Sequence, residues 1–190
     1  SEGCRCLGGG QQGECRVRKP FDFYPTPLSI VRLMVDEYIK RTPVVRRSTP
    51  VWEPCAGDGR IAEALKAAGV CDVMETDIQK GQNFFDFGHA PLEHVVTNPP
   101  FKDIRKFIDH AFAIGVKRMA LVCPERLWAC KKGREQFQRH RPNIFANMDW
   151  REDYLGKGGS PDRALAVSIW WQPCADICYF DVWSKEKDRI

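Results

Sequence analysis

The chain has 190 residues, of which 43% are hydrophobic and 28% charged, and its formal net charge is +4. This length suits one domain with a sizeable core, and the charge is only a mild hint of a polyanionic partner. No apolar run reaches membrane-spanning length and the first residues lack a signal peptide, so we expect no membrane association and a cytoplasmic location.

Residues 1–20, rich in Gly, Gln and Arg, are expected to be a flexible arm ahead of one domain over residues 21–190. In chain order, the hydrophobic pattern and the breaker residues predict helices over 26–41, 61–68, 101–114 and 125–140. They predict strands over 51–52, 71–74, 94–97, 118–123, 164–171 and 178–183. The alternation predicts an α/β fold with a mostly parallel sheet and an antiparallel hairpin formed by the last two strands.

The nine cysteines are odd in number and irregularly spaced. Three lie in apolar segments and are expected to be small buried hydrophobes: Cys55, Cys71 and Cys123. Four of the five cysteines near the termini could form a zinc site if the termini meet: Cys4, Cys6, Cys15, Cys174 and Cys178. Their spacing is not a paired CxxC pattern, so we favour free thiols and expect no metal.

A glycine-rich turn, EPCAGDG at 53–59, follows the first predicted strand. Gly57 and Gly59 permit a tight turn and a close approach of backbone to a ligand, and they also fit a dinucleotide fingerprint. Two acids, Glu53 and Asp58, disfavour a pyrophosphate at this turn. An adenosyl ligand that carries an amine and a sulfonium suits these acids better.

Further acids and aromatic residues follow the second predicted strand. Glu75 or Asp77 is placed to accept hydrogen bonds from a ribose diol. In the segment NFFDF at 83–87, Asp86 is a candidate to accept a hydrogen bond from an adenine amino group. The aromatic rings of the segment, Phe87 among them, are candidates to stack on the adenine. Each feature alone is equally consistent with a plain turn or a solvated acid, but their order along the chain favours a nucleoside site.

The tetrapeptide Asn98-Pro99-Pro100-Phe101 follows the third predicted strand. An adenine amino nitrogen is a poor nucleophile because its lone pair is delocalised into the ring. Two acceptors on its hydrogens, the Asn98 side chain and the Pro99 carbonyl, would favour a tetrahedral nitrogen with a free lone pair. The prolines stiffen the backbone, and Phe101 offers a stacking face for a flipped base. Such catalysis depends on positioning and charge complementarity and needs no metal.

The order of FYPTP at 23–27, EPCAGDG at 53–59 and TNPPF at 97–101 resembles class I S-adenosylmethionine-dependent adenine-N6 DNA methyltransferases with gamma-type motif order, especially small phage and prophage enzymes. The resemblance covers about residues 21–183. It implies a Rossmann-like fold with a seven-stranded sheet, S-adenosylmethionine as cofactor, and the target base at residues 98–101. It also implies cofactor contacts from Tyr24, Thr26, Glu53, Ala56, Gly57, Gly59, Glu75 or Asp77, Asp86 and Phe87.

Larger members of that family carry a separate target-recognition domain, for which this chain has no room. Specificity would then come from loops, the N-terminal arm or a partner protein. Basic residues near the expected site are candidates for phosphate contacts, or equally a solvated helix face: Lys131, Lys132, Arg134, Arg139, Lys157 and Arg163. The loop 156–163 is either a lid or a connector, and Trp128 and Trp150 are expected in the core.

Three alternatives stay open. The same chemistry could act on RNA adenine or on a protein glutamine, because the tetrapeptide alone excludes neither. A module that binds cofactor or nucleic acid without turnover is a second alternative, which the intact tetrapeptide disfavours. A nicotinamide oxidoreductase is the third, and only the glycine fingerprint supports it.

Overall fold

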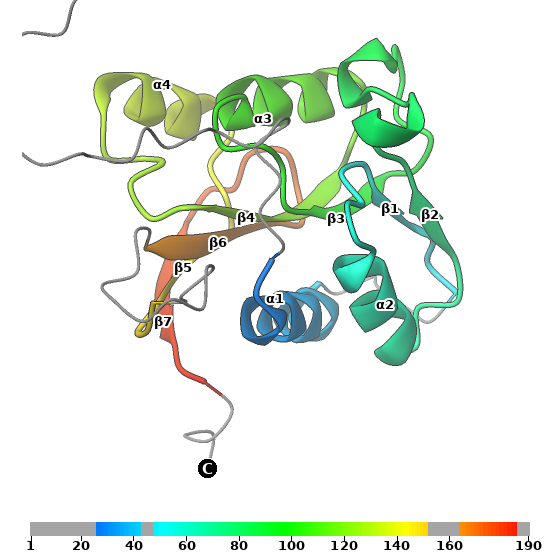
Figure 1. Cartoon of the computed structure of the whole chain (residues 1–190). Coiled ribbons are helices and arrows are strands. Elements are labelled where there is room, and N and C mark those ends of the chain that lie inside the picture. Colours follow the sequence, from blue (N-terminus) through cyan, green and yellow to red (C-terminus); the bar gives the residue numbers. More distant parts are fainter. Residues whose placement is uncertain (1–25, 43–47, 152–163, 186–190) are drawn as a thin grey trace, which may run out of the picture.

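The computed structural model describes residues 26–42, 48–151 and 164–185 (Figure 1). The helices in these ranges are α1 (Leu28–Arg41), α2 (Arg60–Ala67), α3 (Ile104–Ala113) and α4 (Lys131–Arg139). The strands are β1 (Val51–Glu53), β2 (Val73–Glu75), β3 (His94–Thr97), β4 (Arg118–Pro124), β5 (Ile144–Met148), β6 (Leu165–Trp170) and β7 (Tyr179–Trp183). Two single turns of 3-10 helix, η2 (Ile78–Lys80) and η3 (Phe84–Asp86), follow β2.

The strands form one seven-stranded sheet in the order β2-β1-β3-β4-β6-β5-β7. Neighbouring strands run parallel from β2 to β4, and β5 and β7 are also parallel to each other. Only β6 runs antiparallel to both of its neighbours, β4 and β5. The expected α/β fold with a mostly parallel, seven-stranded sheet is therefore confirmed.

The expected pairing of the last two strands with each other is wrong. β6 and β7 do run in opposite directions, but β5 lies between them and pairs with both. The antiparallel feature of this sheet is therefore the insertion of β6 between β4 and β5. The local pattern of residues 144–148 did not predict β5, and without that strand β6 and β7 were left to pair with each other.

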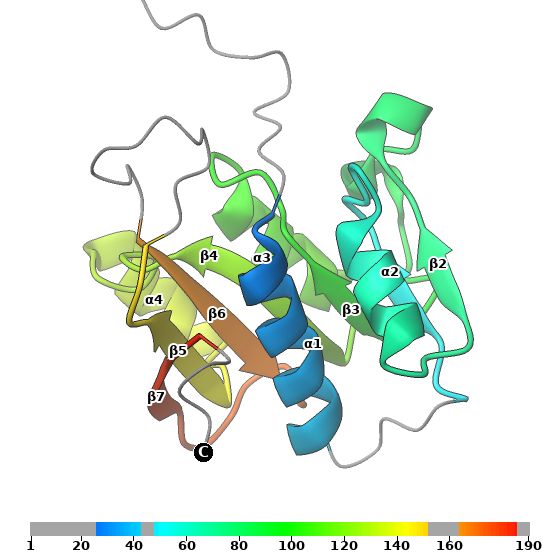
Figure 2. The ribbon, with the colours of Figure 1, turned by 60° about the horizontal axis from the view of Figure 1, so that its bottom comes forward.

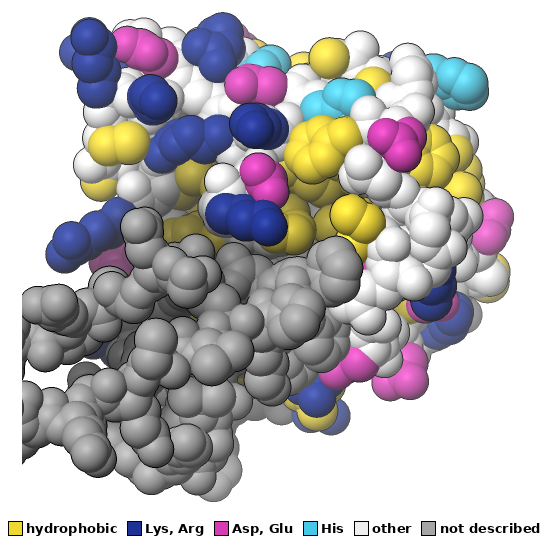
Figure 3. Space-filling model, turned by 45° about the horizontal axis from the view of Figure 1, so that its top comes forward, with side chains coloured by type: hydrophobic (Ala, Val, Ile, Leu, Met, Phe, Trp, Pro, Cys, Tyr) yellow, Lys and Arg dark blue, Asp and Glu magenta, His cyan; other side chains and the backbone are white. Residues whose placement is uncertain are grey.

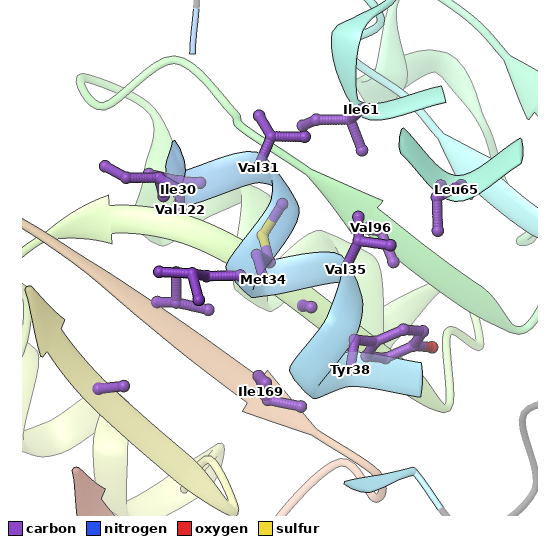
Figure 4. Packing of buried hydrophobic residues seen from close by; sticks show 14 of the residues in the cluster. Ile30, Val31, Met34, Val35, Tyr38, Ile61, Leu65, Val96, Val122 and Ile169 are labelled. Carbon is purple, nitrogen blue, oxygen red and sulfur yellow. The ribbon is translucent and has the colours of Figure 1, made fainter. Parts of the chain in front are cut away.

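Helices cover both faces of the sheet, with α1 and α2 on one face and α3 and α4 on the other (Figures 1 and 2). The buried face of α1 carries Ile30, Met34 and Val35, which point toward the strands in Figure 4. A second apolar cluster lies under α3, where Phe107 stacks on Phe84 at a ring-centroid distance of 3.9 Å. Burial of these two layers is the main driving force that holds the sheet.

Residues in the loops determine where several strands end and where several helices begin. β3 stops at Thr97, because two consecutive prolines cannot continue the hydrogen-bond ladder. Gly59 has a φ of 82°, a left-handed conformation that favours glycine, and it caps the start of α2. The helix expected from residue 125 begins only at Lys131, because residues 125–130 form turns in which Leu127 N donates to Pro124 O.

The expected core positions are largely confirmed. Trp128 packs against Trp170 at 6.3 Å between ring centroids, and Trp150 packs against the cluster under α1. Cys123 is fully buried and Cys55 partly so, but Cys71 is exposed because the strand starts two residues later, at Val73. Within the described part of the chain, no helix is long and apolar enough to cross a membrane.

Candidate functional site

A cavity of about 310 Å³ opens at the carboxyl ends of β1, β2 and β3. Ligands of α/β proteins bind at this end of parallel strands, because the loops there converge. The lining residues come from the segments that follow these strands and from the segment that precedes α1. Nine of them are site residues expected from the sequence: Thr26, Glu53, Ala56, Gly57, Asp77, Asn98, Pro99, Pro100 and Phe101.

Backbone and carboxylate hydrogen bonds fix the glycine-rich turn. Gly57 N donates to Asp77 Oδ2 at 2.8 Å, and Gln79 N donates to the other oxygen, Asp77 Oδ1, at 2.7 Å. Ala56 N donates to the carbonyl of Thr76 at 3.1 Å, which ties the turn to the end of β2. The cavity wall is therefore held by its own residues, and Asp77 faces both the turn and the cavity.

Glu53 is a buried acid at the end of β1. Its side chain lines the cavity, and Oε2 has no hydrogen-bond partner among the described residues. Burial raises the pKa of Glu53 to about 9; the Ala62 amide opposes this shift, and the nearby acids Glu75, Asp58 and Asp77 add to it. A cationic ligand group beside this acid would lower its pKa and pair with the carboxylate, so the acid suits a cation better than a phosphate.

The two acids at the end of β2 differ in position, although both were candidates for the ribose from the sequence. Asp77 lines the cavity and is 6% exposed. Glu75 pairs with Lys66 at 2.9 Å and is not among the lining residues. Gly59 also lies outside the cavity lining, with Glu75 as its neighbour. The geometry therefore favours Asp77 over Glu75.

The segment after η2 places only some of the residues that the sequence suggested in the cavity. Asn83 and Phe85 line the cavity, whereas Asp86 and Phe87 do not. Asp86 is exposed and accepts a hydrogen bond from Asn83 Nδ2 at 3.2 Å, and Phe87 packs on Trp52 at 5.0 Å. The single turn η3 directs Asp86 away from the cavity, which the spacing of the motif did not indicate.

The tetrapeptide forms the other wall of the cavity. Asn98 Nδ2 donates to Thr26 Oγ1 at 2.8 Å, so the amide nitrogen is engaged. The buried Asn98 Oδ1 has no hydrogen-bond partner among the described residues. Asp103 N donates to the carbonyl of Pro100 at 3.0 Å and closes the turn that leads into α3. Two of the described lining residues therefore each carry a buried oxygen atom without a hydrogen-bond partner, Asn98 Oδ1 and Glu53 Oε2.

Several cavity residues were not anticipated. They lie close in sequence to the recognised motifs, so proximity to a motif was the available signal: Arg60, Ile78, Gln79, Asn83, Lys102 and Asp103. Arg60 pairs with Asp58 at 2.7 Å, and its Nη1 donates to the carbonyl of Thr26 at 3.1 Å. It thus joins the glycine-rich turn to the segment that precedes α1.

The expected nucleic-acid residues are divided between described and undescribed parts of the chain. Lys131, Lys132, Arg134 and Arg139 are all on α4, and Arg139 pairs with Asp109 of α3 at 3.3 Å. Lys and Arg side chains gather over α4 and α3 on the face shown in Figure 3. Tyr24, Lys157, Arg163 and the arm at 1–20 lie outside the described residues.

The zinc alternative concerns cysteines of which only two are described. Cys174 is exposed and Cys178 half-buried, and both are free thiols. Cys4, Cys6 and Cys15 lie outside the described residues. Among the residues that the structure does describe, no three His, Cys, Asp or Glu side chains are grouped as metal ligands.

No protein-family model matches the sequence, and no curated protein matches it. Solved structures do match. The methyltransferase subunit of a type I restriction-modification system from Streptococcus thermophilus superposes with a TM-score of 0.57 at 12% identity, over 83% of this chain and 47% of that chain. The type IIG restriction endonuclease BpuSI gives a TM-score of 0.51 at 14% identity, over 79% of this chain and 25% of that chain.

A protein from Listeria monocytogenes assigned to the class I S-adenosylmethionine-dependent methyltransferases gives a TM-score of 0.51 at 9% identity, over 82% of this chain and 63% of that chain. The chain thus spans about half or less of the length of the type I methyltransferase subunit and of BpuSI. Identities this low establish the fold alone. The chain has the Rossmann-like fold of class I S-adenosylmethionine-dependent methyltransferases.

Proposed function

We propose that this protein transfers a methyl group from S-adenosylmethionine to the N6 amino group of adenine in DNA. The observation that carries the proposal is Asn98 Oδ1, a buried acceptor at the cavity wall without a partner among the described residues. A buried acceptor of this kind is costly unless a ligand satisfies it. The exocyclic amino group of adenine is a donor with two hydrogens and satisfies it directly.

The cavity fits the cofactor on its own residues. Glu53, with its unpartnered Oε2, is suited to the ammonium group of the methionine part, and Asp77 to the ribose hydroxyls. Asn83 and Phe85 also line the cavity and are suited to the adenine ring, in place of the expected Asp86 and Phe87. When bound, the cofactor supplies an electrophilic methyl group on a sulfonium.

The tetrapeptide prepares the acceptor nitrogen. Asn98 Oδ1 and the Pro99 carbonyl accept hydrogen bonds from the two amino hydrogens, so the nitrogen becomes more tetrahedral and its lone pair is directed away from the ring. Pro99 and Pro100 have no backbone N–H that would compete for these acceptors. Phe101 lines the cavity and offers a stacking face for the base. These groups act by position and charge, which costs no reorganisation during the reaction.

DNA is the proposed carrier of the adenine. One structural neighbour is the methyltransferase subunit of a restriction-modification system and another is a restriction endonuclease. The exposed cations of α4 lie beside α3, the helix that follows the tetrapeptide. We propose that the protein consists of an N-terminal arm, residues 1–20, and one catalytic domain, residues 21–190. We also propose that target recognition comes from loops, the arm or a partner protein.

The direct test is transfer of tritiated methyl from S-adenosylmethionine to unmethylated duplex DNA, to RNA and to a glutamine-bearing protein, followed by analysis of the modified product. N6-methyladenine in DNA that is absent with Asn98→Ala supports the proposal. Label only in RNA or protein overturns the proposed substrate and keeps the chemistry. No label in any acceptor, with cofactor binding retained, overturns the proposed activity.

The phosphate contacts have a separate test. We expect Lys131→Ala/Lys132→Ala to weaken DNA binding and to lower the slope of log K against log[salt] by about 0.9 for each phosphate that the variant no longer neutralises. Lys66→Ala/Lys117→Ala is the matched control, because these lysines carry the same charge but pair with Glu75 and Glu93. Equal effects of the two double variants would attribute binding to net charge alone.

A further inference from the structure

Thr26 lies next to Pro27, the residue that caps the start of α1, and its side chain is buried, at 6% exposure. Its hydroxyl oxygen accepts a hydrogen bond from Asn98 Nδ2 at 2.8 Å, across 72 positions of the sequence. The family resemblance implied a cofactor contact for Thr26. The hydrogen bond in the structure instead joins it to the residue that faces the target amine.

In the structure this hydrogen bond engages the nitrogen end of the Asn98 amide and leaves the oxygen end without a partner among the described residues. An amide side chain carries a donor at Nδ2 and an acceptor at Oδ1, and the two ends are nearly equal in size. With Nδ2 held by Thr26, the atom left for a ligand is Oδ1. With the Asn98 amide in the opposite orientation, its N–H groups would point at the target amine, which is itself a donor. The acceptor Oδ1, which activates that amine, would then point away from it.

Thr26 is in turn held from the other side of the cavity. Its backbone carbonyl accepts a hydrogen bond from Arg60 Nη1 at 3.1 Å, and Arg60 Nε pairs with Asp58 at 2.7 Å. A continuous path of polar contacts therefore runs from the glycine-rich turn through Arg60 and Thr26 to Asn98. A hydrogen bond from a fixed residue restricts Asn98 more than one from a mobile residue would.

We propose that Thr26 is a positioning residue whose hydroxyl group fixes the Asn98 amide with its oxygen toward the target amine. The proposal rests on the proposed function, because the orientation matters only for a donor substrate at Asn98. Thr26 itself touches no reacting atom in this role. Its contribution therefore belongs to turnover and not to cofactor affinity.

The test compares Thr26→Val, which removes the hydroxyl group at nearly constant shape, with Thr26→Ser, which keeps it. Because one hydrogen bond from the described residues holds the amide, we expect Thr26→Val to lower kcat about tenfold while the cofactor Kd changes less than about twofold. Thr26→Ser is expected to stay near wild type. A weaker cofactor Kd with unchanged kcat, or equal reductions of kcat in both variants, would overturn the positioning role.

A readout independent of turnover separates this proposal from the proposed function. In protein labelled with ¹⁵N-asparagine, the Asn98 side-chain NH₂ signals are expected to exchange slowly with solvent in wild type and Thr26→Ser, and rapidly in Thr26→Val. Unchanged exchange in Thr26→Val overturns the positioning role, whether or not the enzyme is active. Wild-type protein that methylates no acceptor overturns the proposed function, and the exchange measurement then still decides whether Thr26 holds the amide.

Discussion

Replacing Glu53 by Gln is expected to stabilise the ligand-free protein, and the gain is expected to grow with pH. The Glu53 side chain is 1% exposed, and burial raises its pKa to about 9. In the unfolded chain a glutamate has a pKa of about 4.3. The folded protein therefore retains a proton at pH 7 that the unfolded chain has released.

The direction in which the free energy of unfolding changes with pH follows from this difference in bound protons. A raised pKa contributes stability that is fully present below about pH 4.3 and is lost as the pH rises toward about 9. The decrease amounts to about 1.4 kcal/mol per pH unit for one proton, so wild type loses about 2 to 3 kcal/mol from this group between pH 5 and pH 7. A glutamine at this position does not titrate and avoids this decrease.

The assay is urea unfolding of wild type, Glu53→Gln and Glu63→Gln at pH 5, 6 and 7. Glu63 is the control, because it is an exposed acid on α2. The difference in free energy of unfolding between Glu53→Gln and wild type should widen by about 2 to 3 kcal/mol over this range. A difference that stays constant with pH would refute the reasoning. Weaker cofactor binding by the more stable variant would show that the acid is retained for function.

Two further predictions concern the cavity wall and α4. Asn83→Ala is expected to weaken cofactor binding in calorimetry more than Asp86→Ala, because only Asn83 lines the cavity; the reverse order would restore the assignment made from the motif. Gly133→Ala is expected to lower the free energy of unfolding by about 1 to 3 kcal/mol, because an added Cβ overlaps the Leu127 carbonyl oxygen. Gly88→Ala, where a Cβ meets open space, is the control, and equal unfolding energies for both variants would contradict the overlap.

The sheet from β2 to β3 could be predicted well because its strands end in strong local signals. β1 ends at the glycine-rich turn and β3 at two prolines, so their ends were predicted to within a residue. β5 was missed because hydrophobic and polar residues alternate poorly over residues 144–148, which include the polar Asn147. Its pairing with β6 and β7 stabilises the strand, and the local pattern does not show this pairing. Tertiary pairing of this kind leaves little trace in a single sequence.

The candidate site could likewise be predicted where local signals exist and not where tertiary contacts decide. Residues inside the motifs, such as Glu53 and Asn98, were placed at the cavity by their position at strand ends. Asp86 was misleading because one turn of 3-10 helix redirects a side chain, and residue spacing does not reveal such a turn. The hydrogen bond between Thr26 and Asn98 joins segments 72 positions apart, so no local pattern indicates it.

The place of β6 in the sheet has a consequence for how the chain assembles during synthesis. The described residues that line the cavity all come from positions 26–107, and the strands that frame the cavity, β1 to β3, are complete before position 98. β5 pairs only with β6 and β7, both of which are made later, so it has no partner in the sheet until residues 165–170 have left the ribosome. Until then the edge of β4 is unpaired and open to other chains. Mutations in β6 should therefore affect the yield of folded protein more than the chemistry of the site.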